Sequence, residues 1–309
     1  MNFALFLGCT IPARLSQYES SSRAVLGKLG VGLYDIEEFN CCGYPLRNLS
    51  FKTFVLSSAR NLALAQKEDL NVMALCKCCY GSLRKVDHLM RENTSLREEI
   101  NRTLEREGLR YEGGIEVRHL LSVLYHQVGI ESIREKMERA YEGLKIATHY
   151  GCHVLRPSQV VQFDDPVAPS IFDQLVEVTG AESVDWATKL ECCGAPAWGI
   201  NDDLSMDLTQ KKLKDGRQSG ADYLCAACPY CHIQFDTVQG AILSQRGTDH
   251  RLPSILYPQL LGLAMDIDGE VLGLEMNQVP IDGIGGFLSN ERSAVSNQLS
   301  AGSEETDSG

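Results

Sequence analysis

Cys41-Cys42-Gly43-Tyr44-Pro45 and Cys192-Cys193-Gly194-Ala195-Pro196 are two copies of one motif within a chain of 309 residues. A Gly-Cys step precedes each copy, at Gly8-Cys9 and Gly151-Cys152. A C-x2-C motif follows each copy and starts 34 residues after Cys42 (Cys76 with Cys79) and 35 residues after Cys193 (Cys228 with Cys231). The same order at nearly the same spacing in both halves indicates a tandem duplication.

Each half alternates short apolar runs with stretches of helical periodicity, which is typical of βαβ units with parallel strands. The predicted strands are 3–7, 31–36 and 72–75 in the first half, and 145–149 and 221–224 in the second. The predicted helices are 20–29, 53–66, 84–107, 120–128 and 131–141. We therefore expect an α/β fold of two pseudo-symmetric domains, each with a small parallel sheet flanked by helices. Cysteines at the carboxyl ends of strands would gather where such sheets bind ligands.

The repeat predicts an N-terminal domain at 1–143, a C-terminal domain at 144–275 and an extension at 276–309. The tail is rich in Ser, Glu, Asn and Gly and is expected to be largely disordered from about residue 289. The Glu- and Arg-rich stretch 84–107 is expected to be a solvated helix stabilised by i, i+4 pairs.

Composition excludes several classes of function. The formal net charge is −12 and the isoelectric point about 5.1, which disfavours nucleic acid and anionic lipid as partners. No apolar run approaches the roughly 20 residues of a membrane helix. The N-terminal run that ends at Cys9 resembles a lipoprotein signal but has no basic segment before it. We therefore expect a cytoplasmic protein whose 12 cysteines bind metal or do redox chemistry.

Five matched cysteines per half exceed the four ligands of a zinc ion or of an ordinary four-iron cluster. Adjacent cysteines suit a multinuclear cluster, in which each sulfur meets a different iron. The fifth thiolate would either bridge two irons or stay unbound, and the spacing leaves both possibilities open. Zinc binding and a disulfide framework are the weaker alternatives.

Residues around the cysteines fit such a site. The glycine of each motif would let the backbone approach a bulky cofactor, and helices predicted to begin at Tyr80 and His232 would direct N–H groups at thiolates. Cys78 and Cys225 lie outside the matched set and are interpreted as passive neighbours.

The pattern of Cys, CCG and C-x2-C, present twice, resembles the CCG-domain proteins and, among them, the B subunits of heterodisulfide reductases. Further agreement comes from Tyr150-Gly151-Cys152-His153, Leu155-Arg156-Pro157, Asp164-Asp165-Pro166, Cys228-Pro229-Tyr230-Cys231-His232 and the run 258–264. The resemblance implies two noncubane [4Fe–4S] clusters, each bound by five cysteines. The first set would be Cys9, Cys41, Cys42, Cys76 and Cys79, and the second Cys152, Cys192, Cys193, Cys228 and Cys231.

The resemblance also implies a reaction, the reductive cleavage of the mixed disulfide of coenzyme M and coenzyme B. His153 and His232 adjoin two of these cysteines, and imidazoles titrate in the range that proton delivery needs. Arg47, Lys77 and Arg156 could attract a sulfonate or phosphate, but an ordinary surface position is expected for each.

The implied partners are a ferredoxin-like C subunit and a flavin-containing A subunit. Neither an FAD fingerprint nor a ferredoxin cysteine run ending in Cys-Pro is present, so we expect no flavin in this chain. Two alternatives remain: the B subunit of a bacterial sulfur-oxidising complex, and a non-catalytic electron-relay subunit. A zinc-binding interaction module is a third, weaker one.

Overall fold

The computed structural model describes residues 1–247 and 251–289. The first half contains, in order, β1 Asn2–Phe6, α1 Thr10–Arg14, α2 Ser16–Lys28, β2 Gly32–Tyr34, η1 Tyr44–Leu46, α3 Phe51–Lys67, β3 Asn71–Ala74, α4 Lys77–Glu92, α5 Thr94–Leu104, η2 Glu105–Glu107, β4 Val117–His119, α6 Leu120–Val123, the π-helical turn η3 Leu124–Val128 and α7 Ile130–Glu135. The second half contains β5 Lys145–His149, α8 Ser158–Val161, α9 Ile171–Glu177, β6 Glu182–Ser183, η4 Ala195–Ala197, α10 Asp202–Gln218, β7 Tyr223–Ala226, α11 Pro229–Ile233, the π-helical turn η5 Gln234–Val238, α12 Gln239–Arg246, β8 Ser254–Leu256, α13 Tyr257–Ala264, α14 Gly269–Leu272, η6 Leu274–Met276 and η7 Asp282–Phe287.

These strands form two four-stranded parallel sheets with equivalent order, β2-β1-β3-β4 and β6-β5-β7-β8. The central pairs have equivalent registers, with Phe6 opposite Ala74 in the first sheet and His149 opposite Ala226 in the second. Four of the five residues of β1, and likewise of β5, are buried, as expected for strands covered on both faces. The α/β fold with two pseudo-symmetric halves is therefore confirmed.

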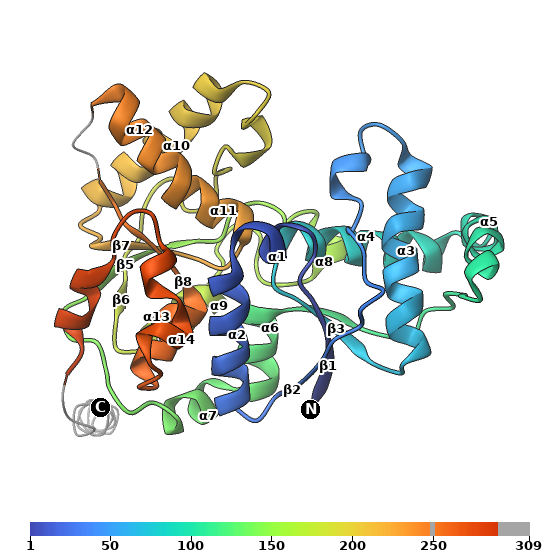
Figure 1. The fold of residues 1–309 in the computed structure, drawn as a ribbon, viewed down its shortest axis with the longest axis horizontal. Coiled ribbons are helices and arrows are strands. Elements are labelled where there is room, and N and C mark those ends of the chain that lie inside the picture. The colour runs from blue at the N-terminus through green and yellow to red at the C-terminus, as the bar shows by residue number, and fades with distance from the viewer. Residues whose placement is uncertain (248–250, 290–309) are drawn as a thin grey trace, which may run out of the picture.

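The two halves share their core. Helix α2 of the first half packs against α13 and α14 of the second, and Figure 1 shows it standing between the N-terminal sheet and these helices. Buried apolar residues of both halves, from Phe3 to Leu288, form one connected cluster. The predicted boundaries at 143/144 and 275/276 stay predictions. Ser289 donates its amide to the carbonyl of Ala140, and the rest of the expected disordered tail, 290–309, lies outside the described residues.

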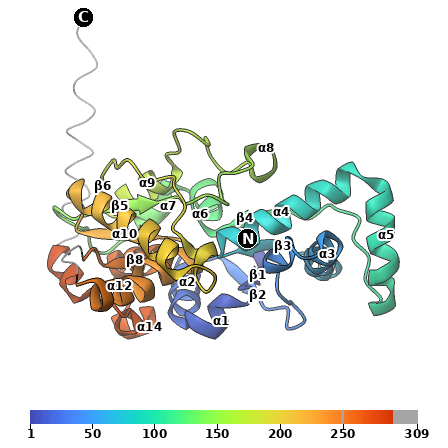
Figure 2. The same cartoon turned by 90° about the horizontal axis from the view of Figure 1, so that it is seen from above.

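Several predicted elements were wrong in extent, among them the following three. Stretch 84–107 is divided between α4 and α5 because Asn93 leaves the helical conformation and its side chain caps α5 through the amide of Leu96; Figure 2 shows α5 at the end of the molecule away from the C-terminal half. The helix predicted at 131–141 ends at Glu135. Tyr141 lies outside it because its backbone forms a β-bridge with Leu288 and its hydroxyl donates to the carbonyl of Leu260. The strand predicted at 221–224 is shifted to Tyr223–Ala226 and so includes Cys225.

Strands β4, β6 and β8 have no counterpart among the predictions. Each is two or three residues long at a sheet edge, too short for a periodic pattern to reveal. None of the helices among the described residues is long and apolar enough to cross a bilayer.

Candidate metal centre

The five matched cysteines of the first half come together at the carboxyl end of its sheet. Cys9 follows β1, Cys41 and Cys42 lie in the loop before η1, and Cys76 and Cys79 open α4 after β3. Their thiols interact in a chain that runs from Cys9 to Cys41, Cys42, Cys79 and Cys76.

The second half repeats this arrangement. Its thiols interact in the order Cys152, Cys192, Cys193, Cys231 and Cys228. We call these two sets of five cysteines the N-terminal and C-terminal thiol groups. The thiol of Cys228 also interacts with those of Cys76 and Cys78, so the two groups are contiguous.

The helices that carry each C-x2-C motif begin earlier than predicted. Helix α4 begins at Lys77 rather than Tyr80, and α11 at Pro229 rather than His232. Cys76 and Cys228 are the extended N-cap residues, which places Cys79 and Cys231 inside the first helical turn. Both cysteines of each motif therefore lie at a helix N-terminus, where unpaired N–H groups favour thiolate.

The glycines near the thiols have different tasks. A Cβ on Gly8 would lie 2.8 Å from Sγ of Cys79, so this glycine allows the close approach to a thiol. Gly43 and Gly194 have φ of 80° and 97° and pack against α3 and α10 instead. The expectation that the CCG glycine faces the cofactor was therefore wrong: its missing side chain makes room for a helix backbone.

Crowding of the thiols separates their acidities. Hydrogen bonds from Cys41 and Cys79 lower the pKa of Cys42 well below its usual range, and those from Cys152 and Cys193 lower the pKa of Cys192 to about 2. Burial opposes ionisation of Cys228, but hydrogen bonds from Cys231, Cys76 and Cys78 lower its pKa as well. In each thiol group the neighbours of one cysteine thus favour its thiolate, the form that binds metal.

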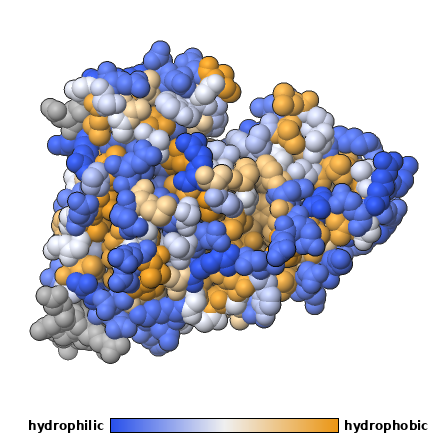
Figure 3. Space-filling model, viewed as in Figure 1, coloured by the Kyte–Doolittle hydropathy of each residue, from blue (hydrophilic) through white to orange (hydrophobic). Residues whose placement is uncertain are grey.

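Each thiol group borders a cavity. All five C-terminal cysteines line one of about 330 Å³, together with Tyr44, Arg47, Lys77, Cys78, His153 and Tyr230. All five N-terminal cysteines line a narrower one of about 10 Å³. Tyr44, Pro45, Cys78 and Tyr230 belong to both walls, so the two cavities adjoin. In the view of Figure 3 the surface is hollowed between the lobe of α10 and α12 and the lobe of α3.

Cys78 lies at the junction of the two cavities, and His153 lines the larger cavity beside it. Nδ1 of His153 lies 3.1 Å from Sγ of Cys152 and 3.8 Å from Sγ of Cys78, and the ring packs edge-on against Tyr44. Burial lowers the pKa of His153. Cys78 forms part of the wall between the two thiol groups.

Other predicted residues lie elsewhere. His232 is fully buried, its Nδ1 lies 3.2 Å from Oγ of Ser254, and it lines neither of the two cavities. Burial lowers the pKa of His232 to about 4. Cys225 is buried within β7, also away from both cavities, and the exposed Arg156 bonds to the carbonyls of Leu190 and Pro166.

The surface position expected for Lys77 was wrong. This lysine is 2% exposed, lines the larger cavity, and donates from Nζ to the carbonyl oxygens of His149 (2.8 Å) and Tyr150 (2.9 Å). The two carbonyls belong to the other half, so folding of the repeat turns a side chain beside Cys76 into an interdomain contact.

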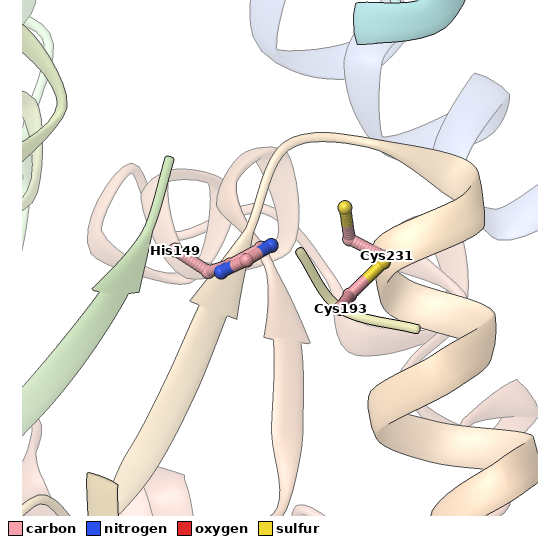
Figure 4. A group of neighbouring side chains, drawn as sticks. All are labelled: His149, Cys193 and Cys231. Carbon is pink, nitrogen blue, oxygen red and sulfur yellow. The ribbon is translucent and has the colours of Figure 1, made fainter. Parts of the chain in front are cut away.

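Sequence reasoning missed His149, which also lies in this region. Its imidazole and the thiols of Cys193 and Cys231 all have their ligand atoms within 4.8 Å of one another, and Figure 4 shows the ring turned towards the two thiols. The available signal was its place at the end of a predicted strand, three residues before Cys152.

Fold and thiol groups together define a duplicated α/β protein with two adjoining polythiolate sites. The family model of the CCG cysteine-rich domain matches this chain twice, at residues 3–84 and 146–236. The chain belongs to the CCG cysteine-rich domain family.

Several named proteins are similar over nearly their whole length. The B subunit of the ferredoxin:CoB-CoM heterodisulfide reductase of Methanosarcina mazei is 35% identical, with 89% of this chain and 93% of that protein covered. A protein of Archaeoglobus profundus, described as similar to the B subunit of heterodisulfide reductase, is 32% identical over 87% and 92%. The membrane anchor subunit of the 8-methylmenaquinol:fumarate reductase of Wolinella succinogenes is 31% identical over 92% and 99%.

A solved structure shares the fold. The crystal structure of a hypothetical protein from Helicobacter pylori superimposes with a TM-score of 0.71 at 19% identity, covering 91% of this chain and 52% of that one.

The donor chemistry fits iron–sulfur binding. Thiolates are the ligands that such clusters use, and the two groups of five thiols supply them. In both groups the thiols interact directly with one another, so a cluster would need them to move apart.

Proposed function

We propose that this chain is the catalytic subunit of a heterodisulfide reductase complex. It would reduce a disulfide of the CoM-S-S-CoB type at two noncubane [4Fe–4S] clusters. The observation that carries the proposal is the junction of the two thiol groups, whose cavities adjoin along Tyr44, Pro45, Cys78 and Tyr230. A disulfide in the larger cavity would contact the C-terminal thiol group and lie next to the wall that this cavity shares with the N-terminal one.

The proposed ligands are the ten matched cysteines. Cys9, Cys41, Cys42, Cys76 and Cys79 would hold the N-terminal cluster; Cys152, Cys192, Cys193, Cys228 and Cys231 would hold the C-terminal one. When bound, the clusters supply single electrons and iron atoms that can accept sulfur. Two electrons and two protons convert one disulfide to two thiols.

Side chains in the cavity wall would position the substrate and move protons. Arg47 and the buried Lys77 place positive charge there, which favours a substrate with an anionic substituent. His153 would deliver a proton to a departing thiolate. His232, the second predicted donor, is kept out of this proposal because it lines neither cavity.

The similarity to the Methanosarcina protein supports membership of a complex. We propose a ferredoxin-like C subunit and a flavin-containing A subunit as partners. The A subunit would bring the flavin, for which this sequence has no FAD fingerprint. Co-purification of a tagged chain from its native host would identify them.

The Wolinella relative favours a second candidate, an electron-relay subunit. In this role the same clusters would pass electrons on, and the larger cavity would hold no disulfide. A bacterial sulfur-oxidising complex is a variant of the first candidate with a persulfide substrate.

One experiment separates these functions. The chain is purified anaerobically, and its iron, acid-labile sulfide, zinc and EPR spectrum are measured. About eight irons per chain, four for each of two clusters, are expected. Thiol release from heterodisulfide, supplied with a chemical reductant, then supports catalysis. Full clusters without thiol release would favour the relay, and zinc without sulfide would overturn both.

A further inference from the structure

The two halves place different side chains at one equivalent position beside their thiol groups. The sequences Phe6-Leu7-Gly8-Cys9 and His149-Tyr150-Gly151-Cys152 end the two equivalent central strands. A Cβ on Gly8 would meet Sγ of Cys79 and the ring of Phe6. A Cβ on Gly151 would meet Sγ of Cys231 at 3.7 Å and Nε2 of His149 at 3.2 Å. The N-terminal group thus has an apolar ring where the C-terminal group has an imidazole.

The imidazole of His149 lacks a hydrogen-bond partner among the described residues. The residue is fully buried, and neither Nδ1 nor Nε2 makes a hydrogen bond. Phe235 packs edge-on against the ring, with centroids 4.9 Å apart, and the ligand atoms of His149, Cys193 and Cys231 all lie within 4.8 Å of one another. Buried donors are rarely left unpaired, which points to a sulfur acceptor at this site.

A neutral imidazole carries one N–H, which it can donate to sulfur.

A second difference between the halves also favours negative charge at the C-terminal thiol group. Helices α3 and α10 are equivalent and both 17 residues long, and Asn61 of α3 corresponds to Lys212 of α10. Asn61 is neutral and bonds to backbone carbonyls of the CCG loop, including that of Cys41. Lys212 is completely buried and donates to the carbonyl of Thr188; burial lowers its pKa to about 8, and the nearby thiols of Cys193 and Cys231 oppose this by favouring its charged form.

We propose that His149 and Lys212 make the C-terminal cluster the electron acceptor of the pair, with a higher reduction potential than the N-terminal cluster. This inference rests on the proposed function, since it requires both clusters. Reduction adds negative charge, which an N–H···S hydrogen bond and a buried cation stabilise. Phe6 and Asn61 give the N-terminal cluster neither.

The consequence concerns the direction of electron transfer between the clusters. All five cysteines of the C-terminal group line the larger cavity, so the cluster that holds the electron would be the one beside the substrate. The contact between Cys76 and Cys228 would bring the N-terminal cluster close enough to reduce the C-terminal cluster again.

The test is an EPR-monitored redox titration of the reconstituted full-length holoprotein. Cys42→Ala and Cys193→Ala, each expected to keep one cluster, assign the signals to the two halves. In the wild type the C-terminal cluster should have the higher midpoint potential. His149→Phe copies Phe6, the equivalent residue of the first half. It should lower the equilibrium constant for reduction of the C-terminal cluster about tenfold, which is about 59 mV for a one-electron couple, and leave the N-terminal cluster unchanged.

Two further variants test the inference independently, in case His149→Phe does not fold. Phe6→His should raise the potential of the N-terminal cluster. Lys212→Met should lower that of the C-terminal cluster, whereas the neighbouring exposed Lys211→Met should not. Equal potentials in the wild type, or no shift in any of these variants, would overturn the inference.

Other outcomes are equally decisive. Loss of iron from His149→Phe would mean that the histidine is a ligand, and would overturn the hydrogen-bonding role. A wild-type protein that takes up no iron and sulfide would overturn the proposed function, and this inference with it. Potentials that split as expected without heterodisulfide turnover would support the inference while removing catalysis from the proposed function.

Discussion

Cys76 and Cys79 show how two cysteines three residues apart come to serve one site. Cys76 is the extended N-cap residue of α4, and Cys79 lies in the first helical turn, so one helix start directs both thiols to the same side. Cys228 and Cys231 repeat this on α11. For single residues, the geometry of the site is therefore set by where these helices begin.

Removing one buried cysteine of an adjacent pair should empty one site and spare the other. Cys42→Ala deletes a thiol between Cys41 and Cys79, and Cys193→Ala removes a thiol between Cys192 and Cys231. We expect each variant to lose about half of the bound iron, together with one of two EPR signals. Iron content and both signals unchanged from wild type would contradict the ligand assignment.

Cys78→Ser is the matched control, because Cys78 is buried at the same junction without belonging to the repeated set. Its iron content should equal that of the wild type. Loss of iron in this variant would show that Cys78 is a ligand and that the first C-x2-C motif is aligned wrongly.

His153→Gln should slow disulfide reduction on the order of 10²-fold, the usual contribution of a positioned proton donor. Iron content should be unchanged, because the imidazole adjoins the C-terminal thiol group without belonging to it. Steady-state turnover and iron analysis are measured side by side, with the exposed His88→Gln as control. Normal turnover would remove His153 from the proposed mechanism.

Among the helices and loops, the two CCG loops depend on the helices that follow them. Gly43 and Gly194 have left-handed backbone conformations, and a Cβ would lie 3.0 Å from the carbonyl oxygen of Phe54 in the first case and 2.8 Å from that of Ser205 in the second. The hydroxyls of Ser58 and Thr209 hold the same loops by donating to the carbonyls of Cys42 and Cys193.

Alanine at Gly43 or Gly194 should therefore destabilise the fold by about 1–3 kcal/mol, the typical strain of a left-handed residue with a side chain. The change is measured by thermal or denaturant unfolding. Gly27→Ala is the control: this helical glycine is exposed with free space around it, so alanine should stabilise by about 0.5–1 kcal/mol. Equal effects at all three positions would contradict the explanation.

Across the molecule, the repeats are interlocked. Residues Tyr18, Val25 and Leu26 on α2 are buried, and this helix packs against α13 and α14 from the far end of the chain. Lys28 adds polar contacts to Glu138 and to the carbonyl of Met265. Each half supplies apolar surface that covers the other.

Neither half should fold by itself. Residues 1–143 expressed alone should aggregate or lack a cooperative unfolding transition, because the apolar face of α2 is then exposed. Co-expression with residues 144–309 should restore a soluble complex. Circular dichroism during heating checks this, and a separate 1–143 fragment that melts cooperatively near the temperature of the whole chain would contradict it.

The duplication, the parallel α/β halves and the grouping of the cysteines could all be predicted from the residues and their order. Spacing between Cys9, the CCG pair and the C-x2-C motif is a local property, and parallel strands bring their carboxyl ends to one edge. That made five strands and most helices predictable, with ends off by a few residues. Short edge strands such as β6 were not predictable, because pairing with the adjacent strand, rather than the β-propensity of their own residues, determines that they form.

How the halves face one another depends on packing that no local pattern encodes. Packing joined the two thiol groups at Cys76 and Cys228, buried Lys77 between the halves, and moved His232 away from the cavities. It also set His149 against Cys231, where the other half has Phe6. These contacts link residues far apart in the chain, and the burial and dielectric that give them chemical meaning exist only once the halves have packed.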